Sequence, residues 1–312
     1  MPLKLLGSTL VLCSLLGING ARANSLPAPG SPPAASCFNP GEFDRQVQTQ
    51  APKTPDLRLL IVEINEPDIQ QLGLWPLSDR IIASTLAELQ RHRPAVIGLD
   101  LYRDRPVEPG RSALLAQLKQ SNVVVIQSLG NATPGTAVSA PAGVKPDQVG
   151  FIDTLTDPDG IVRRQLLFAS LSHGKSVASF AFQVATRYLS RVGVVPQASP
   201  QNPQHLQLGA VVLPPLERYC SNRVDLGGYQ IPLHYRAAEK VARTVTLTQV
   251  VRRQVNPAWV RGKIVLIGIT APSLKDIFLT PYRDRRGAPL SQAGVVLQAQ
   301  MISQLVTTAL GE

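Results

Sequence analysis

Residues 262–282 read GKIVLIGITAPSLKDIFLTPY, and this stretch decides the expected fold. Residues 264–269 form an almost unbroken aliphatic run, which predicts a strand that is covered on both faces rather than wetted at alternate positions. A strand of this kind belongs to a parallel sheet with helices on each side, and ligands tend to bind at the carboxyl ends of such strands. Thr270 and Asp276 follow the strand and would lie at that edge of the sheet.

Other segments repeat this alternation of apolar strands and amphipathic helices. The expected strands are residues 57–64, 95–99, 123–126, 161–168, 229–235 and 264–269, and the expected helices are 79–93, 112–119, 175–189 and 294–310. Alternating strands and helices indicate right-handed parallel crossovers. The sequence therefore predicts an α/β fold, a mostly parallel sheet with helices on both faces. We expect one domain over residues 57–312. Within it, the Pro-rich residues 190–228 look like an insertion.

The amino terminus has the pattern of a secretory signal peptide, predicted over residues 1–23. Lys4 supplies a positive end, residues 5–18 are apolar, and residues 21–23 (ARA) present small side chains where a signal peptidase reads them. The apolar stretch is shorter than the ~20 residues that a membrane-spanning helix needs, which favours cleavage. We therefore expect a periplasmic or secreted protein, with an uncleaved membrane anchor facing outside the cytoplasm as the alternative.

Residues 24–56 carry seven prolines among Ala, Ser and Gln, a composition that predicts a disordered linker. Once the leader is removed, the remaining cysteines are Cys37 and Cys220. An exported protein meets an oxidising compartment, where such a pair can form a disulfide. Two unconnected thiols, one in a tail and one in a loop, are the alternative.

The charge of the chain bears on its partners. Lys and Arg outnumber Asp and Glu by 31 to 21, which gives a net charge of +10 that is spread along the chain without long runs of like charge. This pattern favours a solvated basic surface over a nucleic-acid-binding arm, and it is also compatible with peripheral contact with anionic lipids.

Sequence signatures of catalysis are missing. The four histidines lack zinc-ligand spacing, and no phosphate-binding loop or nucleophile elbow occurs. Residues 157–160 (DPDG) resemble a turn more than a calcium loop, because the terminal Glu of an EF-hand is missing. We therefore expect no metal, no cofactor and no enzymatic activity. A hydrolase assembled from distant loops is kept as an alternative.

A binding site is predicted at the rim where the parallel strands end. The polar residues expected there are Glu63, Asn65, Asp100, Thr270 and Asp276. Carboxylates after strands also tie down backbone N–H groups, so loop capping is the competing interpretation.

Arg163 is a further candidate ligand-binding residue, because a guanidinium suits planar anions. Its alternative role is an ion pair with Asp157 or Asp159.

Five motifs follow one another along the chain: LRLLIVEINEPDIQQLGLWP (57–76), AVIGLDLYRD (95–104), DPDGIVRR (157–164), GGYQI (227–231) and GKIVLIGITAPSLKDIFLTP (262–281). In this order they resemble a type-2 CHASE domain, the cyclases/histidine kinases associated sensory extracellular domain of the second class, over about residues 57–310. The resemblance implies a non-enzymatic extracytoplasmic sensory module of a bacterial signal-transduction system, which binds a small ligand or partner and relays a conformational change. A structural or partner-docking periplasmic module is the first alternative, before the hydrolase.

In this family the module commonly precedes membrane spans and a cytoplasmic output domain. The chain reaches Glu312 soon after the last motif, so we expect a stand-alone module or one truncated before the membrane spans, with a small-molecule signal, a membrane receptor or an output protein as partner. Two departures concern the site: Asn65 stands where the family usually has Asp, and Gln298 where it usually has His.

Overall fold

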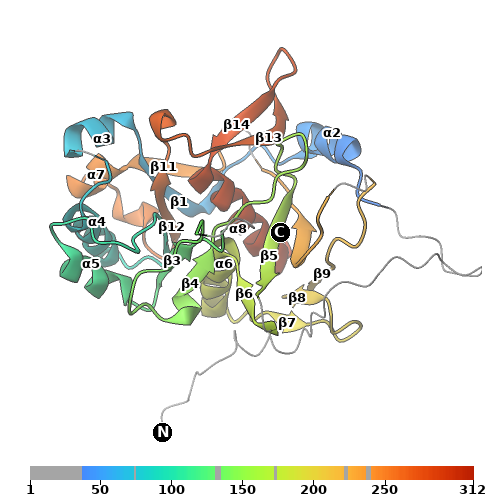
Figure 1. Ribbon diagram of the computed structural model, residues 1–312, viewed down its shortest axis with the longest axis horizontal. Helices are drawn as coiled ribbons and strands as arrows, with labels where there is room; N and C mark the ends of the chain where they lie inside the picture. The colour runs from blue at the N-terminus through green and yellow to red at the C-terminus, as the bar shows by residue number, and fades with distance from the viewer. Residues whose placement is uncertain (1–36, 74, 131–134, 172–173, 221–223, 237–239) are drawn as a thin grey trace, which may run out of the picture.

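The computed structural model describes residues 37–312, apart from 74, 131–134, 172–173, 221–223 and 237–239, and a six-stranded sheet lies at its centre (Figure 1). The strand order is β11-β1-β12-β2-β3-β4, and each neighbouring pair is parallel. The strands are β1 (Asp56–Ile64), β2 (Val96–Asp100), β3 (Val123–Gln127), β4 (Val149–Phe151), β11 (Ala242–Thr246) and β12 (Ile264–Ile269). The predicted α/β fold with a mostly parallel sheet is confirmed.

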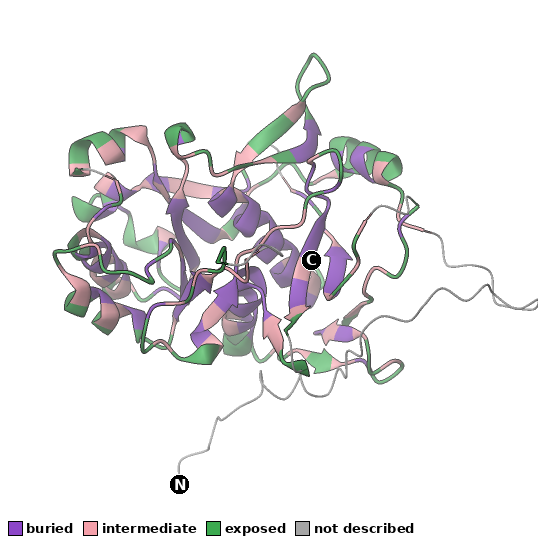
Figure 2. Cartoon of the chain, viewed as in Figure 1, coloured by how far each residue is buried: buried purple, intermediate pink, exposed green. Residues whose placement is uncertain are grey.

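Helices cover both faces of this sheet, as predicted. One face is packed by α6 (Phe180–Leu189) and α8 (Gly294–Leu310), and the other by α4 (Asp79–Arg91), α5 (Arg111–Leu118) and α7 (Leu247–Val251), with α3 (Glu66–Leu72) against α7. Alternate residues of β1 point to opposite faces of the sheet. Leu59 and Ile61 pack into the apolar cluster with α6 and α8, whereas Leu60 and Val62 pack into the cluster with α4 and α5. Figure 2 shows the central strands and α8 as mostly buried segments.

Small antiparallel sheets surround the main sheet. They are β10-β5-β6, with β5 (Arg164–Ser170), β6 (Ser176–Ala178) and β10 (Tyr229–Pro232); the hairpin β13 (Ile277–Arg283) and β14 (Pro289–Ala293); and β7 (Gln197–Ala198), β8 (Leu206–Leu208) and β9 (Val211–Leu213). The last of these lies within residues 190–228, and its Leu206 and Leu208 are buried in the core beside α8. Short 3₁₀ turns are Pro146–Gln148, Ser190–Val192, Pro257–Trp259 and Pro272–Leu274.

Three expected elements differ from the structure. The strand expected over residues 161–168 spans Arg164–Ser170 and pairs antiparallel with β10 and β6 outside the main sheet. Residues 229–235 were expected in the main sheet, but Tyr229–Pro232 pairs with β5 in the antiparallel sheet, and the edge of the main sheet is formed by β11 instead. The helix expected from residue 175 begins at Phe180, because residues 176–178 pair with β5 and Ser179 caps the helix through the Phe182 N–H.

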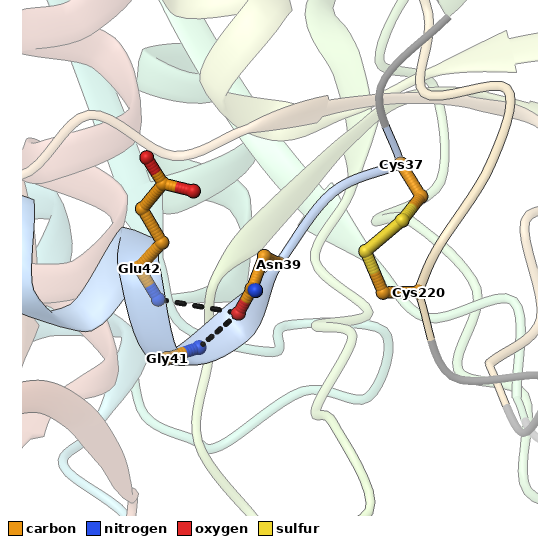
Figure 3. The surroundings of a disulfide bond; sticks show 5 residues. All are labelled: Cys37, Asn39, Gly41, Glu42 and Cys220. Carbon is orange, nitrogen blue, oxygen red and sulfur yellow. Dashed lines mark hydrogen bonds between the residues drawn. A yellow bond between two sulfur atoms is a disulfide. The ribbon is translucent and has the colours of Figure 1, made fainter. Parts of the chain in front are cut away.

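The linker predicted over residues 24–56 is wrong for part of its length. Pro40–Gln50 forms the helix α2, which packs against β13 and buries Phe43 and Val47. Asn39 caps the helix by accepting hydrogen bonds from the N–H groups of Gly41 and Glu42 (Figure 3). Residues 24–36 and the predicted signal peptide lie outside the described residues.

Cys37 and Cys220 form a disulfide with their Cα atoms 5.0 Å apart (Figure 3), which confirms that hypothesis. The bond fixes the segment before α2 to the loop before β10. In the described part of the chain, no helix has the length and apolar character needed to span a bilayer.

Candidate ligand-binding site at the strand ends

A cavity of about 550 Å³ lies at the carboxyl ends of three neighbouring strands of the parallel sheet. Its floor includes Asp100 at the end of β2, Ile126 near the end of β3 and Ile269 at the end of β12. Other walls come from the loops after these strands, from β13 and from the first turns of α8. This is the position at which open parallel sheets usually bind ligands, and the volume falls within the usual range for small-molecule sites.

Two glycines allow α8 to begin against this cavity. Gly268 lies in register with Glu63 on one side and Asp100 on the other, and a Cβ atom at Gly268 would lie 2.5 Å from the Cβ of Val295 in α8. A Cβ atom at Gly294 would lie 2.4 Å from a carboxylate oxygen of Asp276. The first turn of α8 is therefore held between the end of β12 and the loop that carries Asp276.

Asp100 and Asp276 line the cavity together and form its electrostatic centre. Burial among mostly apolar walls, with a smaller contribution from the charge of Asp276, raises the pKa of Asp100 to about 8. Burial also raises the pKa of Asp276, although the Gly294 backbone N–H opposes this shift. Asp100 is half-buried and borders the cavity, and within the described residues no hydrogen bond reaches its carboxylate. Loop capping is therefore not the role of Asp100.

The other predicted rim residues lie beside the cavity and bond to one another. The Thr270 hydroxyl and the Asn65 amide each donate a hydrogen bond of 3.4 Å to the Glu63 carboxylate. Asn65 also accepts from the Asp68 N–H at 3.0 Å and caps α3, which is the capping role kept as an alternative. Glu63, Asn65 and Thr270 thus support the rim, whereas Asp100 and Asp276 face the cavity.

Arg163 does not join this site. Its guanidinium is only 3% exposed and forms ion pairs with Asp44 at 2.7 Å, Asp157 at 2.8 Å and Asp159 at 2.7 Å. The alternative of an ion pair with Asp157 or Asp159 is confirmed for both residues. Asp44 was missed because it lies on α2, within the segment predicted to be disordered.

The predicted turn at residues 157–160 is present, with Gly160 at a φ of +81°. The described ranges contain no group of three or more His, Cys, Asp and Glu side chains that could hold a metal ion.

Several wall residues of the cavity were not predicted from the sequence. They are Trp75, Tyr102, Asp153, Phe278 and Gln298. Gln298 is 5% exposed, and none of the described residues hydrogen-bonds to its amide. The family resemblance marks this position, since a histidine usually stands where this chain has Gln298.

Replacing Asp100 with asparagine should stabilise the protein more strongly as the pH rises. The pKa of Asp100 is about 8 in the fold against an ordinary value of 3.8, so the folded state binds the proton more tightly and loses stability between about pH 4 and pH 8. Asparagine cannot ionise and escapes this loss. We expect the Asp100→Asn variant to gain up to about 4 kcal/mol relative to the wild type between pH 5 and pH 9, about 1.36 kcal/mol for each pH unit up to the pKa of about 8. Urea unfolding at both pH values measures this gain, and an equal difference at the two pH values would contradict it.

An open parallel sheet with helices on both faces and a cavity at its strand ends defines an α/β module with a candidate ligand-binding site. The family model of the CHASE2 domain matches residues 33–312, and the chain belongs to this family. The match confirms the resemblance and begins before residue 57, so that it includes Cys37 and α2. No curated protein and no solved structure matches the chain.

CHASE2 is an extracytoplasmic sensory domain, and domains of this family are generally non-catalytic. The Cys37–Cys220 disulfide is consistent with an oxidising extracytoplasmic space.

Proposed function

We propose that this CHASE2 domain senses a small extracytoplasmic molecule in the strand-end cavity and that α8 carries the conformational response. The observation that supports this most is the composition of the cavity wall, in which Gly294 and Gln298 of α8 stand beside Asp100 of β2. A molecule that binds Asp100 would therefore contact the helix directly. Binding can shift a conformational equilibrium only through such differential contacts.

The helix α8 is suited to transmit a displacement across the domain. Its 17 residues span roughly 25 Å. Near its far end, Thr307 accepts a hydrogen bond of 2.7 Å from Arg58 at the start of β1. A shift at Gly294 would thus reach the amino ends of the strands, opposite the cavity, where we place the contact with a membrane receptor or output protein.

The two alternatives gain less support from the structure. A docking module would favour an exposed apolar face on α8, but no residue of α8 is exposed. A hydrolase would favour a hydroxyl group paired with the perturbed carboxylate, but in the described residues no hydroxyl donates to Asp100. Sensing is therefore the function that fits the site best. We place it in the periplasm or outside the cell, with the leader either cleaved or kept as a membrane anchor.

A thermal-shift screen of periplasmic metabolites tests this proposal. A ligand at 100 times its Kd should stabilise the protein by about 2.7 kcal/mol and raise the Tm by about 5 °C or more. The shift should disappear in Asp100→Asn and persist in Asp104→Asn, a matched control because Asp104 is exposed and lies in the same loop. If no compound stabilises the protein, or if stabilisation survives Asp100→Asn, the proposed function is wrong.

A further inference from the structure

The cavity contains two carboxylates without a counter-charge. Asp100 and Asp276 both line it, and within the described residues neither side chain forms an ion pair. The positive charge on the wall is that of Arg103, whose guanidinium lies 3.7 Å from the fully buried Asp79. Asp79 also pairs with Arg111 at 3.4 Å, and the Arg103 Nε has no hydrogen-bond partner among the described residues. An occupant that brings positive charge would offset the charge of Asp276 and of Asp100 in its ionised form.

The third carboxylate of the wall, Asp153, is satisfied within the protein. It accepts hydrogen bonds of 2.8 Å from the Ser128 hydroxyl and from the Leu129 N–H. Asp153 therefore holds the loop after β4 against the end of β3, and its carboxylate is already hydrogen-bonded without a ligand. By contrast, Asp100 accepts no hydrogen bond among the described residues, and Asp276 is bonded by the Gly294 backbone N–H.

Gln298 provides a hydrogen-bonding group at the cavity wall. Its side chain is 5% exposed and borders the cavity, and its amide has no hydrogen-bond partner among the described residues. The amide atoms themselves keep access to solvent, so they can hydrogen-bond to water or to a ligand in the cavity. Its carbonyl oxygen can accept from an N–H donor.

The size and walls of the cavity exclude a bare metal ion as the natural occupant. A volume of about 550 Å³ far exceeds the ~30 Å³ of a water molecule, to which a small ion is comparable. The rings of Trp75, Tyr102 and Phe278 stand on the same walls. Aromatic faces attract organic cations, above all those with a methylated or apolar body.

We propose that the ligand is an organic ammonium ion, with its cationic group between Asp100 and Asp276 and its apolar body against Trp75, Tyr102 and Phe278. This inference rests on the function proposed above and names the chemical class of the signal.

Binding of a cation should be coupled to proton release. At neutral pH the Asp100 carboxyl is largely protonated when the cavity is empty, because burial and Asp276 raise its pKa to about 8. A cation favours the ionised form and displaces the proton. The titratable groups around the cavity are Asp100, Tyr102, Arg103, Asp153 and Asp276, with Glu63 across Gly268 on β1, and α8 contributes none.

Calorimetric titration of the exported chain with choline tests the proposal, because the charge of choline does not change with pH. The comparison compounds are 3,3-dimethylbutan-1-ol, its neutral isostere, together with phenethylamine, glutamate and Ca²⁺. We expect choline or the phenethylammonium ion to bind while the neutral isostere does not. Its affinity should rise about tenfold between pH 6.5 and pH 8.5, with uptake of the released proton by the buffer.

Two variants and one control complete the experiment. Asp100→Asn and Asp276→Asn should each weaken binding of the cation at least tenfold, and Asp104→Asn should leave it unchanged. Equal binding of the neutral isostere, or binding that is insensitive to both variants, overturns the proposal. If glutamate, Ca²⁺ or a neutral compound binds in an Asp100-dependent manner instead, the sensory function stands and the ammonium ligand is wrong. If no compound of any class depends on Asp100, both proposals fail.

Discussion

Replacement of Arg163 by alanine should destabilise the protein by about 3–5 kcal/mol, the largest loss that we expect from a single polar substitution. The guanidinium is 3% exposed, and it neutralises Asp44 and Asp157, which are both buried. Burial would lower the pKa of Arg163, but hydrogen bonds to its carboxylate partners, Asp44 first, outweigh this effect and raise it. Removing the cation would leave two carboxylates in the interior with much less compensation.

Urea unfolding measures this effect, with Arg105→Ala as the control. Arg105 is 92% exposed, and its contact with Asp104 is 3.8 Å long, so its loss should change the free energy of unfolding by less than about 0.5 kcal/mol. Arg163→Lys should lie between the two, since lysine keeps the charge but not the forked geometry. A loss in Arg163→Ala no larger than that in Arg105→Ala would show that the ion cluster does not support the fold.

Removal of the disulfide in the double variant Cys37→Ser/Cys220→Ser should cost about 2–5 kcal/mol. The bond joins positions 183 residues apart and so restricts the unfolded chain strongly. It also fixes the start of α2, which brings Asp44 to Arg163. We therefore expect part of the loss to come from weaker docking of α2.

The measurement is chemical denaturation with and without a reductant. The wild type should fall to the stability of the double variant when it is reduced, whereas the variant should not respond. Identical midpoints for the oxidised wild type and the variant would contradict a stabilising role of the Cys37–Cys220 bond.

Long apolar segments were predictable from the sequence, because a strand or helix that is covered by the core has a continuous pattern. β12 and α8 were predicted with the bounds that the structure shows. β11 was missed, since its sequence ARTVT is short and alternates as an edge strand does. Residues 229–232 were predicted as a strand but placed in the wrong sheet, because an apolar pattern does not specify the pairing partner.

The helix α2 escaped prediction for a different reason. Its sequence PGEFDRQVQTQ is mostly polar and lies between proline-rich residues, and its buried apolar residues are Phe43 and Val47 alone. Its stability comes from tertiary contacts, namely the disulfide beside it and the Asp44–Arg163 ion pair. Such long-range contacts cannot be read from local sequence.

The candidate site was predictable in part. The rule that ligands bind at the carboxyl ends of parallel strands led to Asp100 and Asp276. It could not separate these two from Glu63 and Thr270, which bond to each other. Gln298 was missed as a site residue because one polar residue on a buried helix has no local signature of a binding role.

The titration of the Asp100 side-chain carboxyl, followed by ¹³C NMR, tests the central claim most directly: that the cavity holds a carboxylate without a partner in mostly apolar surroundings. The account predicts a pKa of about 8 for Asp100 and a fall of that value in Asp276→Asn, because the neighbouring charge is removed. A pKa for Asp100 close to its ordinary value of 3.8 would contradict the account. Such a result would mean that the carboxylate is well solvated, and the strand-end cavity would lose its basis as a binding site for a cationic signal.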